Sequence, residues 1–96
     1  MTDKKIIWSP HAADDLKAQF EWIKADSPAR AREWVGKLFE QIERLKRFPQ
    51  LGRLIPEIGQ SRYRELVVGE YRIFHEIRPK DILIFRIFHA KRLFPS

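Results

Sequence analysis

The chain has 96 residues and a mass of 11.5 kDa, the size of one small domain. Its 19 Lys and Arg residues exceed its 13 Asp and Glu residues, and the net charge is +6. The absence of cysteine excludes disulfide scaffolds, cysteine-ligated metal sites and thiol nucleophiles. The longest apolar run, residues 82–85, is far below the ~20 residues of a membrane span, and the N-terminus lacks the apolar core of a secretion signal. We therefore expect one basic domain, residues 1–96, located in the cytoplasm and away from membranes.

The surplus positive charge is concentrated in the C-terminal half of the chain. Residues 1–48 hold 10 basic and 8 acidic side chains, whereas residues 49–96 hold 9 basic and 5 acidic ones. This imbalance predicts that an anionic partner docks on the C-terminal half. A solvated surface that only keeps the protein dispersed would account for the same charge.

The N-terminal half predicts a strand followed by two helices. Residues 4–8 form the strand, and Ser-Pro pairs at 9–10 and 27–28 each supply an N-cap and a proline at the first helical position. The first helix ends near Ala25, the second ends at Phe48-Pro49, and the short corner between them predicts an antiparallel hairpin. Trp22 lies outside the first apolar stripe, so it forms a second contact surface or lies along its own helix. The two stripes are Ala12, Ala13, Leu16, Phe20 and Ile23, and Ala31, Trp34, Val35, Leu38, Ile42 and Leu45.

The C-terminal half predicts a loop followed by an antiparallel meander of three strands. Residues 49–61 hold two prolines and two glycines among apolar residues, which indicates an ordered loop. The strands are expected at 62–68, 71–78 and 82–89, and Gly69-Glu70 suits a type II′ turn between the first two. The chain is therefore predicted to be an α+β protein.

Strict alternation along the last two strands separates an isoleucine-rich face from a mixed face. The hairpin is expected to cover the isoleucine-rich face, and two helices cover only one face of such a sheet. We therefore expect a partner or a functional cleft on the mixed face. The first face would carry Tyr71, Ile73, His75, Ile77, Ile82, Ile84, Arg86 and Phe88, and the mixed face Arg72, Phe74, Glu76, Arg78, Leu83, Phe85, Ile87 and His89.

The order of several short segments resembles the RelE/ParE superfamily of toxins from bacterial type II toxin–antitoxin modules. The resemblance runs from Trp8-Ser9-Pro10 to Arg92 and implies a microbial-ribonuclease-like α+β fold. It also implies a plasmid-stabilisation or addiction module, growth arrest by the free toxin and a hetero-oligomer with an acidic or amphipathic antitoxin. The further segments are Phe48-Pro49-Gln50-Leu51-Gly52-Arg53, Pro56-Glu57, Arg64-Glu65-Leu66, Tyr71-Arg72-Ile73 and His89-Ala90-Lys91-Arg92.

The superfamily divides by target, and the resemblance favours its ParE-like branch, whose members inhibit DNA gyrase. RelE-like members, which cleave mRNA on the ribosome, carry lysines where this chain has Tyr63 and Glu65. The alternative is a ribosome-dependent mRNA endonuclease of the RelE or YoeB kind. A second alternative is a basic nucleic-acid-binding domain without toxicity.

The nuclease alternative has its own candidate catalytic residues, by resemblance Glu57, Arg72, His89 and Arg92. Cleavage by 2′-hydroxyl attack needs a base, a cation at the phosphate and an acid for the leaving oxygen, and the first three residues fit these roles in order. Each also has an ordinary structural explanation: Glu57 as a cap or ion-pair partner, Arg72 as a brace of the sheet and His89 as a strand-end histidine.

The predicted antitoxin-binding residues are the apolar side chains Leu16, Phe20, Trp34, Phe74 and Phe85. A helix docked in a groove or a strand added to a sheet edge would suit such a surface. No cofactor is expected, and the three histidines have no metal-ligand spacing.

Overall fold

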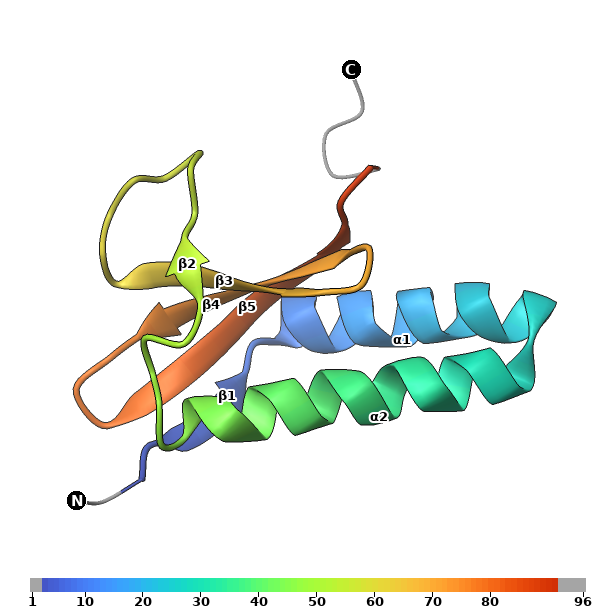
Figure 1. Cartoon of the computed structure of the whole chain (residues 1–96), viewed down its shortest axis with the longest axis horizontal. Helices are drawn as coiled ribbons and strands as arrows, with labels where there is room; N and C mark the ends of the chain where they lie inside the picture. Colours follow the sequence, from blue (N-terminus) through green and yellow to red (C-terminus); the bar gives the residue numbers. More distant parts are fainter. Residues whose placement is uncertain (1–2, 92–96) are drawn as a thin grey trace.

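The computed structural model describes residues 3–91, in which two helices pack on one face of a five-stranded sheet (Figure 1). The predicted α+β class, with an N-terminal strand, a helical hairpin and a meander, is confirmed. Neither helix is long and apolar enough to cross a membrane in this part of the chain. The elements are β1 (Lys5–Trp8), α1 (Pro10–Asp26), α2 (Pro28–Leu45), β2 (Arg53–Leu54), β3 (Tyr63–Val68), β4 (Tyr71–Ile77) and β5 (Asp81–His89).

The helix starts follow the mechanism expected from the two Ser-Pro pairs. Ser9 Oγ accepts a hydrogen bond from the N–H of Ala12 at 3.0 Å, and Ser27 Oγ accepts one from Arg30 at 3.2 Å. Ser27 also ends α1, because its own N–H donates to Ile23 O. A single residue therefore ends one helix and starts the next, which keeps the corner of the hairpin short.

The sheet is mixed, with strand order β1-β5-β4-β3-β2. β1 runs parallel to β5, and all other neighbours are antiparallel. The expected strands of the meander are present, each boundary within one residue of its predicted position. In the β3–β4 turn, Gly69 has a positive φ of +61° and Glu70 has a negative φ. A type II′ turn requires this combination at its two central residues.

The prediction was wrong at two places: it missed a short strand, and it placed the end of the second helix too late. The stretch expected to be only loop contains β2, which pairs Arg53 with Glu65 and Leu54 with Arg64 of β3. Two residues are too few to produce an alternating pattern, so this strand has no signal of its own in the sequence. Helix α2 ends at Leu45, three residues before Phe48, because the chain already turns there: the N–H of Lys46 donates to Glu43 O in a tighter turn.

The main hydrophobic core lies between the hairpin and the sheet. Trp34 and Leu16 pack against it while remaining partly exposed. Its buried members come from both helices and from β3, β4 and β5: Ala12, Leu38, Ile42, Leu45, Leu66, Val68, Tyr71, Ile73, Ile82, Ile84 and Ile87.

A β-bulge at Phe85 changes which face the end of β5 presents. Phe74 is paired with Arg86 and His75 with Ile84, which leaves Phe85 as the extra residue. Beyond it the alternation is inverted, so Ile87 and His89 lie on the helix face and Arg86 and Phe88 on the opposite face. The face assignment predicted by strict alternation was therefore wrong for residues 86–89.

The face of the sheet away from the helices is partly covered by the chain itself. The segment around β2 lies on that side (Figure 1), where Ile55 is fully buried against Phe74. Tyr63, Phe85 and Phe88 pack around this pair. We call this side of the sheet the outer face.

His75 is buried next to Gly52. Burial lowers the pKa of His75 to about 4, and among the described residues neither ring nitrogen has a partner with hydrogen-bond geometry. The imidazole is therefore neutral at pH 7. A Cβ on Gly52 would lie 2.8 Å from His75 Cε1 and 2.6 Å from the Glu65 carbonyl oxygen, so only glycine fits between them.

We predict that Gly52→Ala destabilises the fold. Both clashes involve atoms fixed by the sheet, so the substitution should lower the free energy of unfolding by about 1–3 kcal/mol or more. Gly36→Ala is the matched control: no atom lies within 4 Å of its Cβ position in the middle of α2, so stability should rise by about 0.5–1 kcal/mol. Urea unfolding of both variants measures the difference, and equal stability would contradict the close approach at Gly52.

Candidate functional site

A cluster of two arginines and two glutamates lies on the outer face; we call Arg53, Glu57, Glu65 and Arg72 the arginine–carboxylate cluster. The Glu65 side chain is 0% exposed and accepts hydrogen bonds from Arg53 Nε at 2.7 Å and from Arg72 Nε at 2.5 Å. The two Nη groups of Arg72 donate to the two oxygens of Glu57 at 3.0 and 2.8 Å. Glu65 comes from β3, Arg72 from β4 and Arg53 from β2, while Glu57 lies in the segment after β2.

The electrostatics of this cluster fix its protonation. Hydrogen bonding to Arg72 lowers the pKa of Glu57 to about 2, and the Glu57 hydrogen bond raises the pKa of Arg72 further above its usual range. All three nitrogens of the Arg72 guanidinium donate to carboxylates. In this state two carboxylates compensate the charge of Arg72, three of its five N–H groups are already engaged, and Glu57 carries no proton at neutral pH.

Within residues 3–91, the structure brings two of the three predicted catalytic residues into contact. Glu57 and Arg72 are bonded on the outer face, whereas His89 lies on the helix face beyond the bulge. There His89 Nε2 is 3.3 Å from Glu70 Oε2, and its ring lies edge-on to Tyr71 at 5.1 Å. Arg92 lies outside the described residues.

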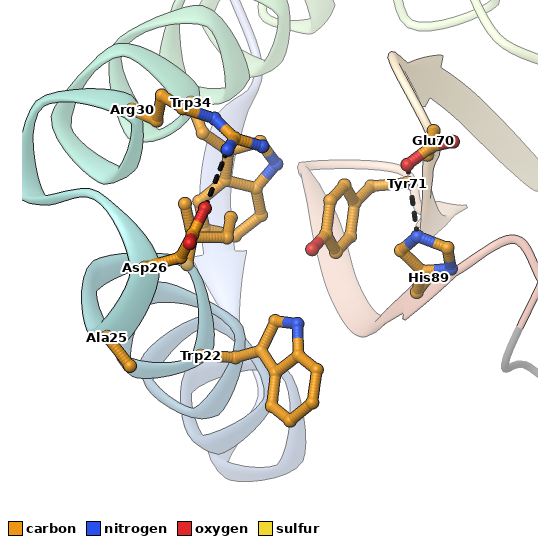
Figure 2. A pocket seen from close by; sticks show the side chains of 9 residues that line it. Trp22, Ala25, Asp26, Arg30, Trp34, Glu70, Tyr71 and His89 are labelled. Carbon is orange, nitrogen blue, oxygen red and sulfur yellow. Dashed lines mark hydrogen bonds and ion pairs between the residues drawn. The ribbon is translucent and has the colours of Figure 1, made fainter.

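A second feature is a cleft of about 640 Å³ between the tip of the hairpin and the β3–β4 turn. Figure 2 shows Trp22 and Trp34 reaching it from the helices, and Tyr71 and His89 from the strands opposite. Two polar contacts flank these rings: the ion pair of Asp26 with Arg30 at 2.8 Å, and the hydrogen bond between Glu70 and His89 at 3.3 Å. We call it the aromatic cleft; Ile23 and Ala25 complete its lining.

The two tryptophans of the aromatic cleft differ in their environment. Trp22 is 66% exposed and lines the cleft, which favours the first explanation for its place outside the stripe, a second contact surface. Trp34 packs against Tyr71 with ring centroids 4.9 Å apart, and its Nε1 is buried without a hydrogen-bond partner among the described residues. A buried N–H without an acceptor costs free energy, so the packing of Trp34 against Tyr71 must offset this cost.

The five predicted antitoxin-binding residues do not form one surface. Trp34 lines the aromatic cleft and Leu16 packs against the main core. Phe74 is only 7% exposed and, with the half-buried Phe85, belongs to the outer-face cluster. Phe20 is half-buried on α1.

Sequence reasoning missed several residues that shape these sites. Asp26, Glu70 and Tyr71 join the aromatic cleft from separate elements, and Glu65 joins the cluster because β3 lies between β2, which carries Arg53, and β4, which carries Arg72. Outside both sites, the carboxylate of Asp15 on α1 accepts hydrogen bonds from Arg86 Nε at 2.8 Å and from the N–H of Ile87 at 2.9 Å, which ties α1 to β5. The only available signal was Trp22, a large aromatic residue outside its apolar stripe.

No metal centre is found in the described part of the chain: within residues 3–91, no three His, Asp or Glu side chains are grouped so that they could hold an ion.

The chain is similar to known toxins along nearly its whole length. A family model described as the ParE toxin of the type II toxin–antitoxin system, parDE, matches residues 6–94. Toxin RelE2 of Caulobacter vibrioides (strain ATCC 19089 / CIP 103742 / CB 15) is 32% identical over 90 residues, which cover 93% of this chain and 98% of that protein. A chain in the solved structure of the chromosomal ParDE TA system from P. aeruginosa has the same fold. Its TM-score is 0.73 at 23% identity, and the match covers 91% of this chain and 96% of that one.

These matches and the fold define the class of the protein, a toxin of the RelE/ParE superfamily. Within that class, the chain belongs to the ParE toxin family of type II toxin–antitoxin systems, because the family model covers almost all of it.

We predict that the two glutamates of the cluster contribute unequally to stability. Glu65→Gln removes a buried charge that compensates two arginines, so the free energy of unfolding should fall by about 3 kcal/mol. Glu57→Gln is the control: its carboxylate is partly exposed and Arg72 keeps Glu65, so the loss should stay below about 1 kcal/mol. Urea unfolding at pH 7 compares them, and a larger loss for Glu57→Gln would contradict the central role of Glu65.

Proposed function

We propose that the protein is the toxin of a type II toxin–antitoxin module and arrests growth by inhibiting DNA gyrase, without cleaving RNA. The observation that carries the proposal is the pairing of Arg72 with two carboxylates, Glu57 and Glu65, which compensate the charge that a nuclease would direct at a phosphate. Membership of the ParE toxin family supports the same conclusion.

The geometry offers little support for nuclease chemistry. A general base works best with a pKa near the working pH, whereas the pKa of Glu57 is about 2. A general acid must act at the same phosphate, but His89 lies on the opposite face of the sheet from Arg72. Tyr63 and Glu65, at the positions where RelE-like enzymes carry lysines, supply no cation, since Tyr63 packs against Phe85 and Glu65 is a buried anion.

The target is tested by adding the purified free protein to a gyrase supercoiling reaction and to a ribosome-dependent mRNA cleavage reaction. We expect supercoiling to be blocked at micromolar protein and mRNA to remain intact. His89→Gln should leave toxicity on induced expression within about twofold of the unchanged protein, because this residue takes no catalytic step in the proposal. Cleaved mRNA with unaffected supercoiling would favour the endonuclease alternative, and the absence of any toxicity would favour a simple nucleic-acid-binding domain.

We further propose that the antitoxin occupies the aromatic cleft. The cleft presents an exposed tryptophan, Trp22, beside the partly exposed ring of Trp34 and the carboxylates of Asp26 and Glu70. Aromatic side chains of this kind are the usual anchors of protein interfaces.

Trp22→Ala should weaken the complex with the cognate antitoxin by about 30-fold, as expected for an aromatic hot spot, while the fold of the free chain is unchanged. Phe39→Ala is the matched control, since Phe39 is a partly exposed aromatic residue that packs on Trp8, outside the cleft, and should change affinity by less than about threefold. Isothermal titration of both variants gives the comparison. Equal affinities would show that the antitoxin binds elsewhere.

A further inference from the structure

A groove of about 740 Å³ lies where the end of α2 approaches the end of β4. Its apolar floor includes Phe48, Leu51 and Ile77, and its rim includes Lys4, Arg44 and Arg47. No carboxylate lines it, whereas Asp26 and Glu70 line the aromatic cleft. We call it the basic groove.

The Phe-Pro-x-Leu-Gly segment builds the floor of the basic groove and holds it in place. The N–H of Phe48 donates to Arg44 O at 2.9 Å, and the N–H of Leu51 donates to Phe48 O at 3.0 Å. Gly52 then lies tightly between the Glu65 backbone and His75. The exposure of Phe48 (55%) and Leu51 (39%) is thus imposed by an anchored turn, and two neighbouring exposed apolar side chains on a fixed turn indicate a contact surface.

The three cations of the rim keep their charge uncompensated by carboxylates. Lys4 Nζ donates to the carbonyl oxygens of Arg78 and Pro79 at 2.6 and 3.0 Å, and Arg44 donates to the neutral Gln41 amide oxygen at 3.2 Å. Within residues 3–91, no ion pair involves Lys4, Arg44 or Arg47. This differs from Arg53, Arg72 and Arg86, which are all paired with carboxylates.

We propose that the basic groove binds an acidic, amphipathic peptide segment of a protein partner. One bulky apolar side chain of that segment packs on Phe48 and Leu51, and flanking carboxylates pair with Arg44 and Arg47. The partner is a peptide rather than a nucleic acid because the floor is apolar and largely aliphatic, which suits leucine-like side chains better than a charged sugar–phosphate backbone.

This site is separate from the aromatic cleft. Arg30 at the cleft and Arg44 at the groove are 14 residues apart on α2, which is about 21 Å along the helix axis. Figure 1 shows the two ends of α2 at opposite ends of the molecule. One toxin molecule can therefore hold a partner in each, and the inference does not depend on the proposed target.

The test uses the free full-length chain and a fluorescein-labelled 12-residue peptide of glutamates and three leucines, followed by fluorescence anisotropy at 0.15 M salt. We expect a dissociation constant on the order of tens of micromolar, and binding at least about tenfold weaker when the leucines are replaced by serine. Arg47→Glu and Phe48→Ser should each weaken binding of the leucine peptide by at least about tenfold.

Arg32→Glu is the charge-matched control. Arg32 is an exposed cation near the start of α2, about 18 Å along the helix axis from Arg44, so at this salt concentration it should change affinity by less than about twofold. Urea unfolding of each variant verifies that the fold is retained.

Three results would overturn the proposal. The serine peptide binding as tightly as the leucine peptide would mean that only net charge is sensed. Equal losses for Arg32→Glu and Arg47→Glu would mean that binding has no defined location. A labelled 12-nucleotide single strand binding more tightly than the leucine peptide, with loss on Arg47→Glu, would assign the groove to nucleic acid.

Discussion

A buried carboxylate must be compensated by cations and hydrogen bonds, and at Glu65 this requirement organises the outer half of the structure. Removing a carboxylate from water costs several kcal/mol. A buried carboxylate without a cation or hydrogen-bond donors beside it has nothing to offset this cost. Glu65 is fully buried and is bonded to Arg53 from one side and to Arg72 from the other. The arginine from β2 draws the chain after α2 onto the edge of the sheet, although β2 is only two residues long.

The same compensation determines what Arg72 can do. A phosphate would have to compete with two carboxylates, Glu57 and Glu65, for the charge of Arg72. The loop that carries Glu57 is held over the outer face by the burial of Ile55. The outer face is consequently a closed structural layer, and the unpaired cations of the rim lie elsewhere, at the far end of α2.

Much of the fold follows from helix-capping and turn residues that can be recognised in the sequence. Each Ser-Pro pair starts a helix because the serine oxygen and the missing proline N–H act within one turn, and Gly69 marks a turn because it alone tolerates the required φ there. The two-residue strand β2 and the bulge at Phe85 were not predictable in this way, because both depend on which residues face them across the sheet. The alternation of polar and apolar residues does not show where a strand contains an extra, bulged residue.

The candidate sites were predictable to a smaller extent than the fold. Trp34 was among the residues expected to bind the antitoxin, and Glu57 and Arg72 were candidates by resemblance to the superfamily. Neither the pattern nor the spacing of the sequence predicted that the side chains of Glu57 and Arg72 touch. The aromatic cleft joins residues 22 to 34 with residues 70 to 89, and its shape depends on how far the hairpin extends along the sheet. Such a juxtaposition is a property of tertiary packing, which a single sequence does not specify.

The bulge at Phe85 also limits how residues can be compared among related chains. β5 has two halves in opposite phase, so a relative that lacks one residue at this position would turn its strand-end histidine to the other face of the sheet. Two histidines in the same alignment column would then face different environments, one beside the hairpin and one beside the arginines. Correspondence of position in β5 therefore implies correspondence of role only between chains that share the extra residue.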